Sequence, residues 1–204
     1  MNHSILLFGA SGHAKVVCSC LESQSVLIEG IFDDNESIKF LDNYPVLGRY
    51  TSNNYSNIPI IVSIGNNQIR KDKVSLIEHS FGLAKHSSAI VDKLVYIGEG
   101  SVIMHMVIVQ RGVSIGKHCI INTAASIDHD CIIEDFVHIS PNATLCGNVH
   151  VGEGTQVGAA SVIKQGIKIG KWAIIGAGSV VINDVPDFSV VVGCPAKKIN
   201  IKNG

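Results

Sequence analysis

The sequence predicts a two-part fold: a Rossmann-like α/β domain over about residues 1–85, followed by a parallel β-helix of hexapeptide repeats over residues 86–204. The β-helix is predicted because every sixth residue from Val91 to Val181 is Val, Ile or Leu, without a slip of frame. The α/β domain is predicted because a short apolar strand near the N-terminus leads through a glycine turn into a helical pattern.

The first predicted strand, Ser4–Phe8, ends in the turn Gly9-Ala-Ser-Gly12-His13, and a helical pattern follows from Ala14 to about Ser23. A helix N-terminus offers free N–H groups and the positive end of the helix dipole, so the turn is a candidate anion site. A tight turn without a ligand is the alternative. The glycines lack the G-x-G-x-x-G spacing, so a nicotinamide or flavin cofactor is not supported.

Two further predicted strands end in residues suited to a ligand. Leu27–Phe32 leads into Asp33 and Asp34, and the apolar run Ile58–Ile64 leads into Gly65. Open α/β sheets bind ligands at the carboxyl ends of their strands, where carboxylates can accept hydrogen bonds from a ribose or a base. We therefore expect one crevice that fits a nucleotide; an ordinary solvated loop is the alternative for the two acids.

The remainder of this domain gives weaker signals. Residues 68–81 read as a helix that carries Arg70, Lys71 and Lys73, and residues 41–57 are expected to be the least ordered part. Residues 82–88 contain no Pro- or Ser-rich linker, so the two domains are expected to pack closely.

The hexad spacing fits neither the helical period nor the alternation of an ordinary strand. It fits coils in which each unit is one short strand and one corner. Stacked coils bury the Val, Ile and Leu side chains that recur at every sixth position, and these residues are called the aliphatic ladder below. Gly, Asn or Asp often follows the ladder residue, which indicates that the glycines mark corners. After Val181, the segment Asn183-Asp-Val-Pro186 breaks the repeat.

Composition narrows the possible partners and the compartment. The 204 residues are 46% hydrophobic and 16% charged with a net charge of −1, which gives no reason to expect nucleic acid or an anionic membrane as partner. The six cysteines lack Cys-x-x-Cys pairs, and Cys119 and Cys131 have the inward phase of the repeat, so we expect reduced, structural thiols. No signal peptide or membrane-length segment is recognised, which favours a cytoplasmic protein.

The coils and the ending Gly193-Cys-Pro-Ala-Lys-Lys-Ile199 resemble the hexapeptide-repeat acyltransferases, whose coils form a left-handed β-helix that trimerises. A narrower resemblance, to bacterial sugar acetyltransferases, covers nearly the whole chain and rests on Gly9-Ala-Ser-Gly-His13, Phe32-Asp-Asp34, Ile64-Gly-Asn-Asn67 with Ile69-Arg70, Ile121-Asn-Thr123, His129-Asp-Cys131 and His138. Within that group the sequence is most similar to enzymes that acetylate a UDP-linked 4-amino-4,6-dideoxy sugar, as in bacillosamine-type glycan synthesis. Sialic acid O-acetyltransferases are near relatives.

The resemblance implies transfer from acetyl-coenzyme A (acetyl-CoA) with His129 as general base and Asp130 raising its basicity. Imidazole titrates near neutrality, and an adjacent carboxylate favours its charged form, so these residue types suit the roles. His129 lies two residues past Ile127, in a corner that is expected to point outward. Without the surrounding pattern, a single exposed histidine is usually an ordinary surface residue.

The resemblance also implies the binding residues and the assembly. Acetyl-CoA contacts are expected at His138, Ala159 and Ala177. Nucleotide-sugar contacts are expected at Ser11, Gly12, His13, Asp33, Asp34 and Gly65. The family trimerises, and its active sites lie between neighbouring subunits.

Several alternatives stay open. The acceptor can instead be a hydroxyl, as in sialic acid, or a GDP- or dTDP-linked amino sugar, and a non-enzymatic trimeric scaffold that senses a nucleotide is a further reading. A zinc site such as that of γ-class carbonic anhydrases is not expected, because the histidines do not recur at the length of one coil. Cys131 points inward by phase, whereas Cys146 at a corner is left open as an acyl-carrying nucleophile.

Overall fold

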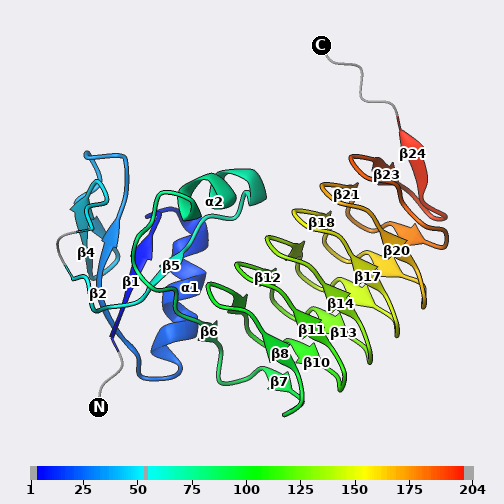
Figure 1. The fold of residues 1–204 in the computed structure, drawn as a ribbon, viewed down its shortest axis with the longest axis horizontal. Coiled ribbons are helices and arrows are strands. Elements are labelled where there is room, and N and C mark those ends of the chain that lie inside the picture. Colours follow the sequence, from blue (N-terminus) through cyan, green and yellow to red (C-terminus); the bar gives the residue numbers. More distant parts are fainter. Residues whose placement is uncertain (1–3, 53–54, 200–204) are drawn as a thin grey trace.

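The computed structural model describes residues 4–52 and 55–199, and both predicted parts of the fold are confirmed: an α/β domain is followed by a parallel β-helix (Figure 1). The α/β domain holds a five-stranded sheet with the order β3-β4-β2-β1-β5. Its elements are β1 (Ser4–Phe8), α1 (Gly12–Glu22), β2 (Leu27–Phe32), β3 (Phe40–Leu41), β4 (Tyr44–Gly48), β5 (Ile60–Val62) and α2 (Asn67–Val74). Strands β1, β2, β4 and β5 are parallel, and β3 forms an antiparallel hairpin with β4.

One prediction for this domain was wrong. The helix predicted over residues 68–81 ends at Val74, because Ser80 to Gly82 run beside β5, where Ile60 donates to the Ser80 carbonyl and Gly82 donates to the Ile60 carbonyl, at 2.9 and 3.0 Å. The segment predicted to be least ordered contains β4, which lies beside β2 in the sheet. Residues 53–54 of that segment are outside the described residues.

The coils form three sheets, each named here by its first strand, and their strands are parallel except for β24, which pairs antiparallel with β23. The β6 sheet contains β6 (Ala84–Lys85), β9 (Val102–Ile103), β12 (Ile120–Ile121), β15 (His138–Ile139), β18 (Gln156–Val157), β21 (Ile174–Ile175), β23 (Val190–Val192) and β24 (Lys197–Ile199). The β7 sheet contains β7 (Ile90–Val91), β10 (Ile108–Val109), β13 (Ser126–Ile127), β16 (Thr144–Leu145), β19 (Val162–Ile163) and β22 (Val180–Val181). The β8 sheet contains β8 (Tyr96–Ile97), β11 (Ser114–Ile115), β14 (Ile132–Ile133), β17 (His150–Val151) and β20 (Lys168–Ile169).

The aliphatic ladder forms the core of the coils, as predicted. From Ile103 to Val181, every ladder side chain is at most 2% exposed. Stacked partners such as Ile121 and Ile139 belong to successive coils of the same sheet. Burial of each such side chain contributes roughly 1.5–3 kcal/mol, and this is why the hexad frame is kept through every coil.

The glycines that follow the ladder lie in the corners, as predicted, but they are not the residues with left-handed backbone. In most corners the left-handed backbone conformation falls two residues later, for example at Gly100 (φ 73°) and Asp130 (φ 58°). At Gly98 the constraint is the neighbouring coil, because a Cβ there would lie 2.6 Å from the carbonyl carbon of Gly116. These glycines therefore permit close stacking of the coils.

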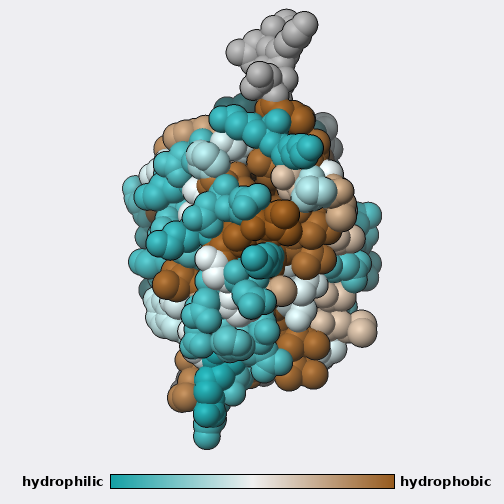
Figure 2. Space-filling view, turned by 90° about the vertical axis from the view of Figure 1, so that its right-hand side faces the viewer, coloured by the Kyte–Doolittle hydropathy of each residue, from teal (hydrophilic) through white to brown (hydrophobic). Residues whose placement is uncertain are grey.

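The predicted break after Val181 is a shortened coil. Ile169 pairs with Val185 and Ile174 pairs with Val190, so the last coil is two residues shorter than the others. Val185 and Val191 still fill the core at 5% exposure. Figure 2 looks onto this end of the coils and shows a hydrophobic area framed by hydrophilic residues.

The two domains share one core, which confirms the expectation that they pack closely. Helix α1 lies between the five-stranded sheet and the coils (Figure 1), and its buried residues belong to the same hydrophobic cluster as the ladder. At this interface Ser19 Oγ lies 3.1 Å from His105 Nε2. Within the described residues, neither helix has the length and hydrophobicity needed to cross a bilayer.

Candidate functional site

The turn after β1 places the N-terminus of α1 at the carboxyl end of the sheet, where the sequence predicts a crevice. Ser63 Oγ donates hydrogen bonds to the carbonyls of Phe8 and Gly9 at 2.9 and 2.7 Å, so β5 holds this turn in place. Ser11 is the N-cap of α1, yet its side chain makes no capping hydrogen bond, and both Ser11 and Gly12 are exposed. The hydroxyl and the first N–H groups of the helix are therefore available to an anion.

The two predicted carboxylates have different surroundings. Asp33 accepts hydrogen bonds from the backbone N–H of Ala10 at 2.6 Å and of Asn35 at 2.7 Å, so it ties the turn after β1 to the end of β2. Asp34 is exposed, and its Oδ2 lies 2.5 Å from Nζ of Lys73 on α2. Asp33 therefore has a structural role in the turn, whereas the carboxylate of Asp34 is accessible to a ligand.

His13, Gly65 and His138 lie together where the crevice meets the coils. The ring centroids of His13 and His138 are 6.4 Å apart. Gly65 lies against the His13 ring, since a Cβ there would be 3.8 Å from its Cγ. Burial, and then the Arg70 charge, lower the pKa of His13 to about 4. Burial, Arg70 and His13 lower the pKa of His138 to about 3, so both rings are neutral at pH 7.

Asn122 orients the His138 ring. Its Oδ1 accepts a hydrogen bond from Thr123 N at 2.8 Å, which fixes the amide so that Nδ2 faces His138 Nε2 at 3.0 Å. Nε2 is therefore the acceptor, and the proton of the neutral ring belongs on Nδ1. The sequence reading quoted Asn122 only as part of a motif and gave it no role.

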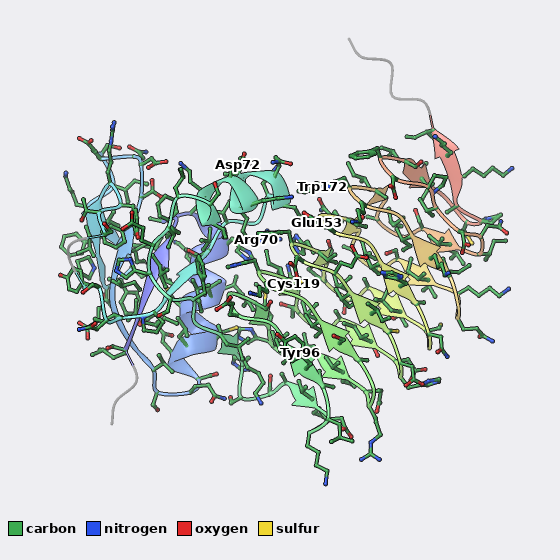
Figure 3. The ribbon with its side chains drawn as sticks, viewed as in Figure 1. Arg70, Asp72, Tyr96, Cys119, Glu153 and Trp172 are labelled. Carbon is green, nitrogen blue, oxygen red and sulfur yellow. The ribbon has the colours of Figure 1, made fainter. Side chains whose placement is uncertain are left out.

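Arg70 is the main residue that sequence reasoning missed. It was predicted on a helix with two lysines, but its side chain is 1% exposed and points from α2 into the junction with the coils (Figure 3). Its guanidinium donates at 2.8–3.2 Å to five oxygens, none of them from a carboxylate: the carbonyls of His118, Ile64, Gly65 and Phe136, and Oδ1 of Asn67. A lone arginine in a helical pattern does not predict burial. The only sequence signal that Arg70 is important was its place in the motif that begins at Ile64.

His129 and Asp130 occupy the corner between β13 and β14. Nδ1 of His129 lies 2.8 Å from Oδ2 of Asp130, and both side chains are more than half exposed, as predicted for an outward corner. The carboxylate accepts a hydrogen bond from Nδ1–H, so the lone pair of the neutral ring is on Nε2. The hydrogen bond to Asp130, followed by the charge of Asp128, raises the pKa of His129 above its ordinary value.

Gly147 provides the space for this ring. It lies one coil beyond His129, and a Cβ there would be 2.6 Å from both Cε1 and Nε2 of the imidazole. The sequence reading did not single out this glycine, because glycines are common in the corners.

Ala159 and Ala177 lie one above the other at the corner between the β6 and β7 sheets. The two coils are joined here by a hydrogen bond from Gly178 N to the Ala159 carbonyl at 2.8 Å. Ala159 is half-buried and Ala177 is exposed, so two small side chains leave a low ridge along the coils.

The structure brings only some of the predicted residues together within one chain. Ser11, Gly12, His13, Asp33, Asp34 and Gly65 lie just beyond the carboxyl ends of β1, β2 and β5, and His13 lies beside His138 of the β6 sheet. Ala159 and Ala177 border the same β6 sheet further along the coils. His129 and Asp130 lie at the corner of the other two sheets, away from the sheet that carries the α/β domain.

Other candidate chemistry has less support. Among the described residues, no group of three or more His, Cys, Asp or Glu side chains is arranged to hold a metal ion. All six cysteines are free, and burial raises the pKa of Cys131 to about 11. Cys146 is half-buried in the coil next to Asp128.

Comparison with known proteins identifies both parts of the chain. Residues 4–77 match the model of the PglD N-terminal domain, and residues 130–165 and 148–183 match the model of the bacterial transferase hexapeptide (six repeats). The structure of a histidine mutant of perosamine N-acetyltransferase from Caulobacter crescentus, in complex with CoA and GDP-perosamine, is 32% identical, with 97% of each chain covered and a TM-score of 0.92. The acetyltransferase domain of PglB from Neisseria gonorrhoeae FA1090 is 34% identical over 97% of this chain and 100% of that chain, with a TM-score of 0.90.

Matches to curated sequences are shorter. The dTDP-3-amino-3,6-dideoxy-alpha-D-galactopyranose 3-N-acetyltransferase of Aneurinibacillus thermoaerophilus is 43% identical over 44 residues. The matched segments span 14% and 23% of the curated relatives concerned.

A small α/β domain carried on hexapeptide coils defines a left-handed β-helix acyltransferase. Within that class, similarity along nearly the whole chain shows that the protein belongs to the hexapeptide-repeat sugar N-acetyltransferases.

Proposed function

We propose that the protein transfers the acetyl group of acetyl-CoA to the 4-amino group of a UDP-linked 4-amino-4,6-dideoxy sugar. The observation that carries this proposal is the His129–Asp130 pair, with Nδ1 and Oδ2 2.8 Å apart and Nε2 free on an outward corner. Such a pair is suited to removing a proton from an attacking amine. The nucleotide carrier and the position of the amine rest on the resemblance described above.

The proposed reaction is a direct transfer. The amine nitrogen attacks the thioester carbon, an N–C bond forms, and the C–S bond breaks to release the thiol of CoA. His129 Nε2 takes the proton from the attacking nitrogen, and this proton passes on to the departing sulfur. Asp130 stabilises the imidazolium that forms in between, because its carboxylate already accepts the Nδ1 hydrogen bond.

The substrates are assigned to two regions. The exposed N-terminus of α1 suits the diphosphate of a nucleotide, and the carboxylate of Asp34 suits the hydrogen-bond donors of its ribose or base. The low ridge at Ala159 and Ala177, together with the neutral ring of His138, suits the extended arm of acetyl-CoA. Support comes also from the similar perosamine N-acetyltransferase, whose structure is described in complex with CoA and GDP-perosamine.

The proposal includes a homotrimer with active sites between subunits. His129 lies at the corner opposite the β6 sheet, so the crevice of the same chain is not adjacent to its own His129. A second chain that brings its His129 corner to this crevice completes the site. The outward side chains of the β7 sheet are uncharged, which favours contact with a neighbouring subunit: Ile90, Ile108, Ser126, Thr144, Val162 and Val180.

A GDP-linked 4-amino sugar is a second candidate acceptor. It is favoured by the likeness to the perosamine enzyme, which covers 97% of both chains. Both candidates use the same base and the same acetyl donor, and they differ only in what the crevice binds.

The proposal is tested by thiol release from acetyl-CoA with UDP-, GDP- and dTDP-linked 4-amino sugars and with sialic acid. We expect turnover with the UDP-linked sugar to fall by about 10²–10⁴ in the His129→Ala variant, which is the usual contribution of a general base. His150→Ala is the matched control, because His150 is also a surface histidine bonded to a carboxylate, that of Glu134 at 2.8 Å. Turnover only with sialic acid would move the acceptor to a hydroxyl, and no turnover with any acceptor would favour the scaffold reading.

A further inference from the structure

A small cleft lies between the carboxyl end of β1, the segments that follow β2 and β4, and the C-terminal end of α2 with the turn after it. Its volume is about 280 Å³, and its lining residues are Phe8, Asp34, Arg49, Tyr50, Lys73, Leu76 and Ile77. It adjoins the turn after β1, because Asp33, which bonds that turn, precedes Asp34 in the chain. A nucleotide with its phosphates at the N-terminus of α1 would therefore have its base directed toward this cleft.

Four of the seven lining residues offer apolar or aromatic surface, and the Tyr50 ring among them is fixed in position. Leu76 and Ile77 provide aliphatic surface. Tyr50 is held by two hydrogen bonds of its hydroxyl, to His79 Nδ1 at 2.8 Å and from Glu78 N at 2.9 Å, and its ring meets that of Phe32 edge to face at 5.4 Å. A flat aromatic ligand suits such walls, because it buries its faces without requiring a polar partner for them.

One charged pair faces the cleft with both a donor and an acceptor. Lys73 Nζ lies 2.5 Å from Oδ2 of Asp34 and 5.5 Å from the centroid of the Phe8 ring. An ammonium group has three donors and a carboxylate has two oxygens, so each can bind a ligand while the ion pair remains intact. Arg49, the other charged residue of the lining, is paired with Glu36 at 2.8 Å.

We propose that Lys73 and Asp34 select the nucleobase by its lactam edge, the C=O group beside a ring N–H. This inference rests on the proposed nucleotide-sugar function and extends it to the base. Lys73 donates to the carbonyl oxygen, and Asp34 accepts from the ring N–H. Uracil, thymine, guanine and hypoxanthine all present this edge.

Cytosine and adenine present the opposite edge, an amino group beside an unprotonated ring nitrogen. In the same position, the amino group meets the Lys73 donor and the ring lone pair meets the Asp34 carboxylate. Both contacts are repulsive, so the pair excludes these bases as well as attracting the others. The inference therefore admits UDP, GDP and dTDP carriers and rejects CDP and ADP carriers.

The test is calorimetric titration of the full chain with two matched pairs of nucleotides. UDP and CDP share a pyrimidine, and IDP and ADP share a purine, so within each pair the ring size and the diphosphate are constant and the base edge is reversed. We expect UDP and IDP to bind about 10- to 100-fold more tightly than CDP and ADP respectively, the size of one good bidentate base contact. The Lys73→Met and Asp34→Asn variants should bring both ratios close to one.

Lys15→Met is the control variant, because Lys15 forms a comparable exposed ion pair with Asp42, at 3.5 Å, away from the cleft. It should keep both ratios, and thermal melts of all three variants check that the fold is intact. Equal binding of UDP and CDP by the unaltered chain would overturn the base selection while the nucleotide site stands. Ratios that persist in both cleft variants would overturn the assignment to Lys73 and Asp34, and binding of none of the four nucleotides would overturn the proposed nucleotide function as well.

Discussion

At the scale of single residues, the chemistry of His129 depends on which ring nitrogen carries the proton. Asp130 lies 2.8 Å from Nδ1 and holds the proton there, so the basic lone pair is on the outward Nε2. The same hydrogen bond raises the pKa of His129. A stronger base is more effective once deprotonated, but it is deprotonated only at higher pH.

The Asp130→Asn variant separates these two effects. Its kcat/KM at alkaline pH should fall about 10- to 100-fold, because the base is weaker and the tautomer is no longer fixed. The acidic limb of its pH–rate profile should move to lower pH, because loss of the carboxylate lowers the pKa of His129. Glu134→Gln, which removes the carboxylate beside His150, should leave the profile unchanged. An acidic limb that stays in place in Asp130→Asn would exclude His129 as the titrating base.

Sequence reasoning located the exposed residues of the candidate site better than the buried ones. The outward direction of His129 follows from its phase in the hexad, and its exposure confirms that prediction. Arg70 shows the opposite case. Its burial depends on carbonyls of His118 and Phe136, which lie 48 and 66 residues away along the chain. No local pattern encodes such a contact, because it arises only when α2 docks on the coils.

At the scale of elements, coil stacking controls the space around the proposed base. Gly147 lies over the His129 ring from the next coil, and it has no left-handed backbone that would itself require glycine. The Gly147→Ala variant should fold with little loss of stability, because the exposed imidazole can turn away from the new methyl group. Its turnover should nevertheless fall at least about tenfold, because a turned ring loses its alignment with Asp130. Steady-state kinetics together with a thermal melt measure this separation, and unchanged turnover would contradict it.

Helix α2 is fixed to the coils by Arg70 rather than by its own helical propensity. The guanidinium fills five acceptors, four of them backbone carbonyls, in a position that is 1% exposed. The Arg70→Met variant leaves these oxygens buried without a donor and should lower the free energy of unfolding by about 3 kcal/mol or more. Arg111→Met removes an exposed ion pair of 3.6 Å and should change it by no more than about 0.5 kcal/mol. Urea denaturation compares the two variants, and equal midpoints would show that Arg70 does not hold the domains together.

The hexad frame made the coil strands predictable because each unit repeats one local rule. The elements that the prediction missed follow rules that span the chain. Strand β4 includes Pro45, which is uncommon within strands, and none of its residues is fully buried, so it forms a strand because it pairs with β2. The shortened last coil likewise depends on pairing of Val190 with Ile174, not on the spacing of the ladder.

At the scale of the whole molecule, the proposed site is divided between two corners of the triangular coil. The crevice borders the β6 sheet, whereas His129 lies between the other two sheets. Two variants of the chain, one without the base and one without a working crevice, should each be inactive alone. When they assemble together, activity should therefore be restored. The first is His129→Ala, which keeps an intact crevice.

The second chain is Gly12→Glu, which keeps an intact base. A Cβ at Gly12 would meet nothing within 4 Å, and an acid in the first turn of α1 suits the helix dipole, so the fold should be unaffected. The added carboxylate lies where the phosphates are proposed to bind and should repel them. Alone, each variant should have almost no activity.

Co-expression in equal amounts should recover about one quarter of the wild-type activity per site, because about half of the crevices are intact and about half of those face an intact His129 from a neighbour. Mixing the separately purified variants, without exchange of subunits, should recover nothing. A co-expressed assembly that stays inactive, although mass spectrometry shows mixed oligomers, would mean that crevice and base must come from the same chain. Recovery near one quarter would instead require that the base of one chain serves the sugar held by another.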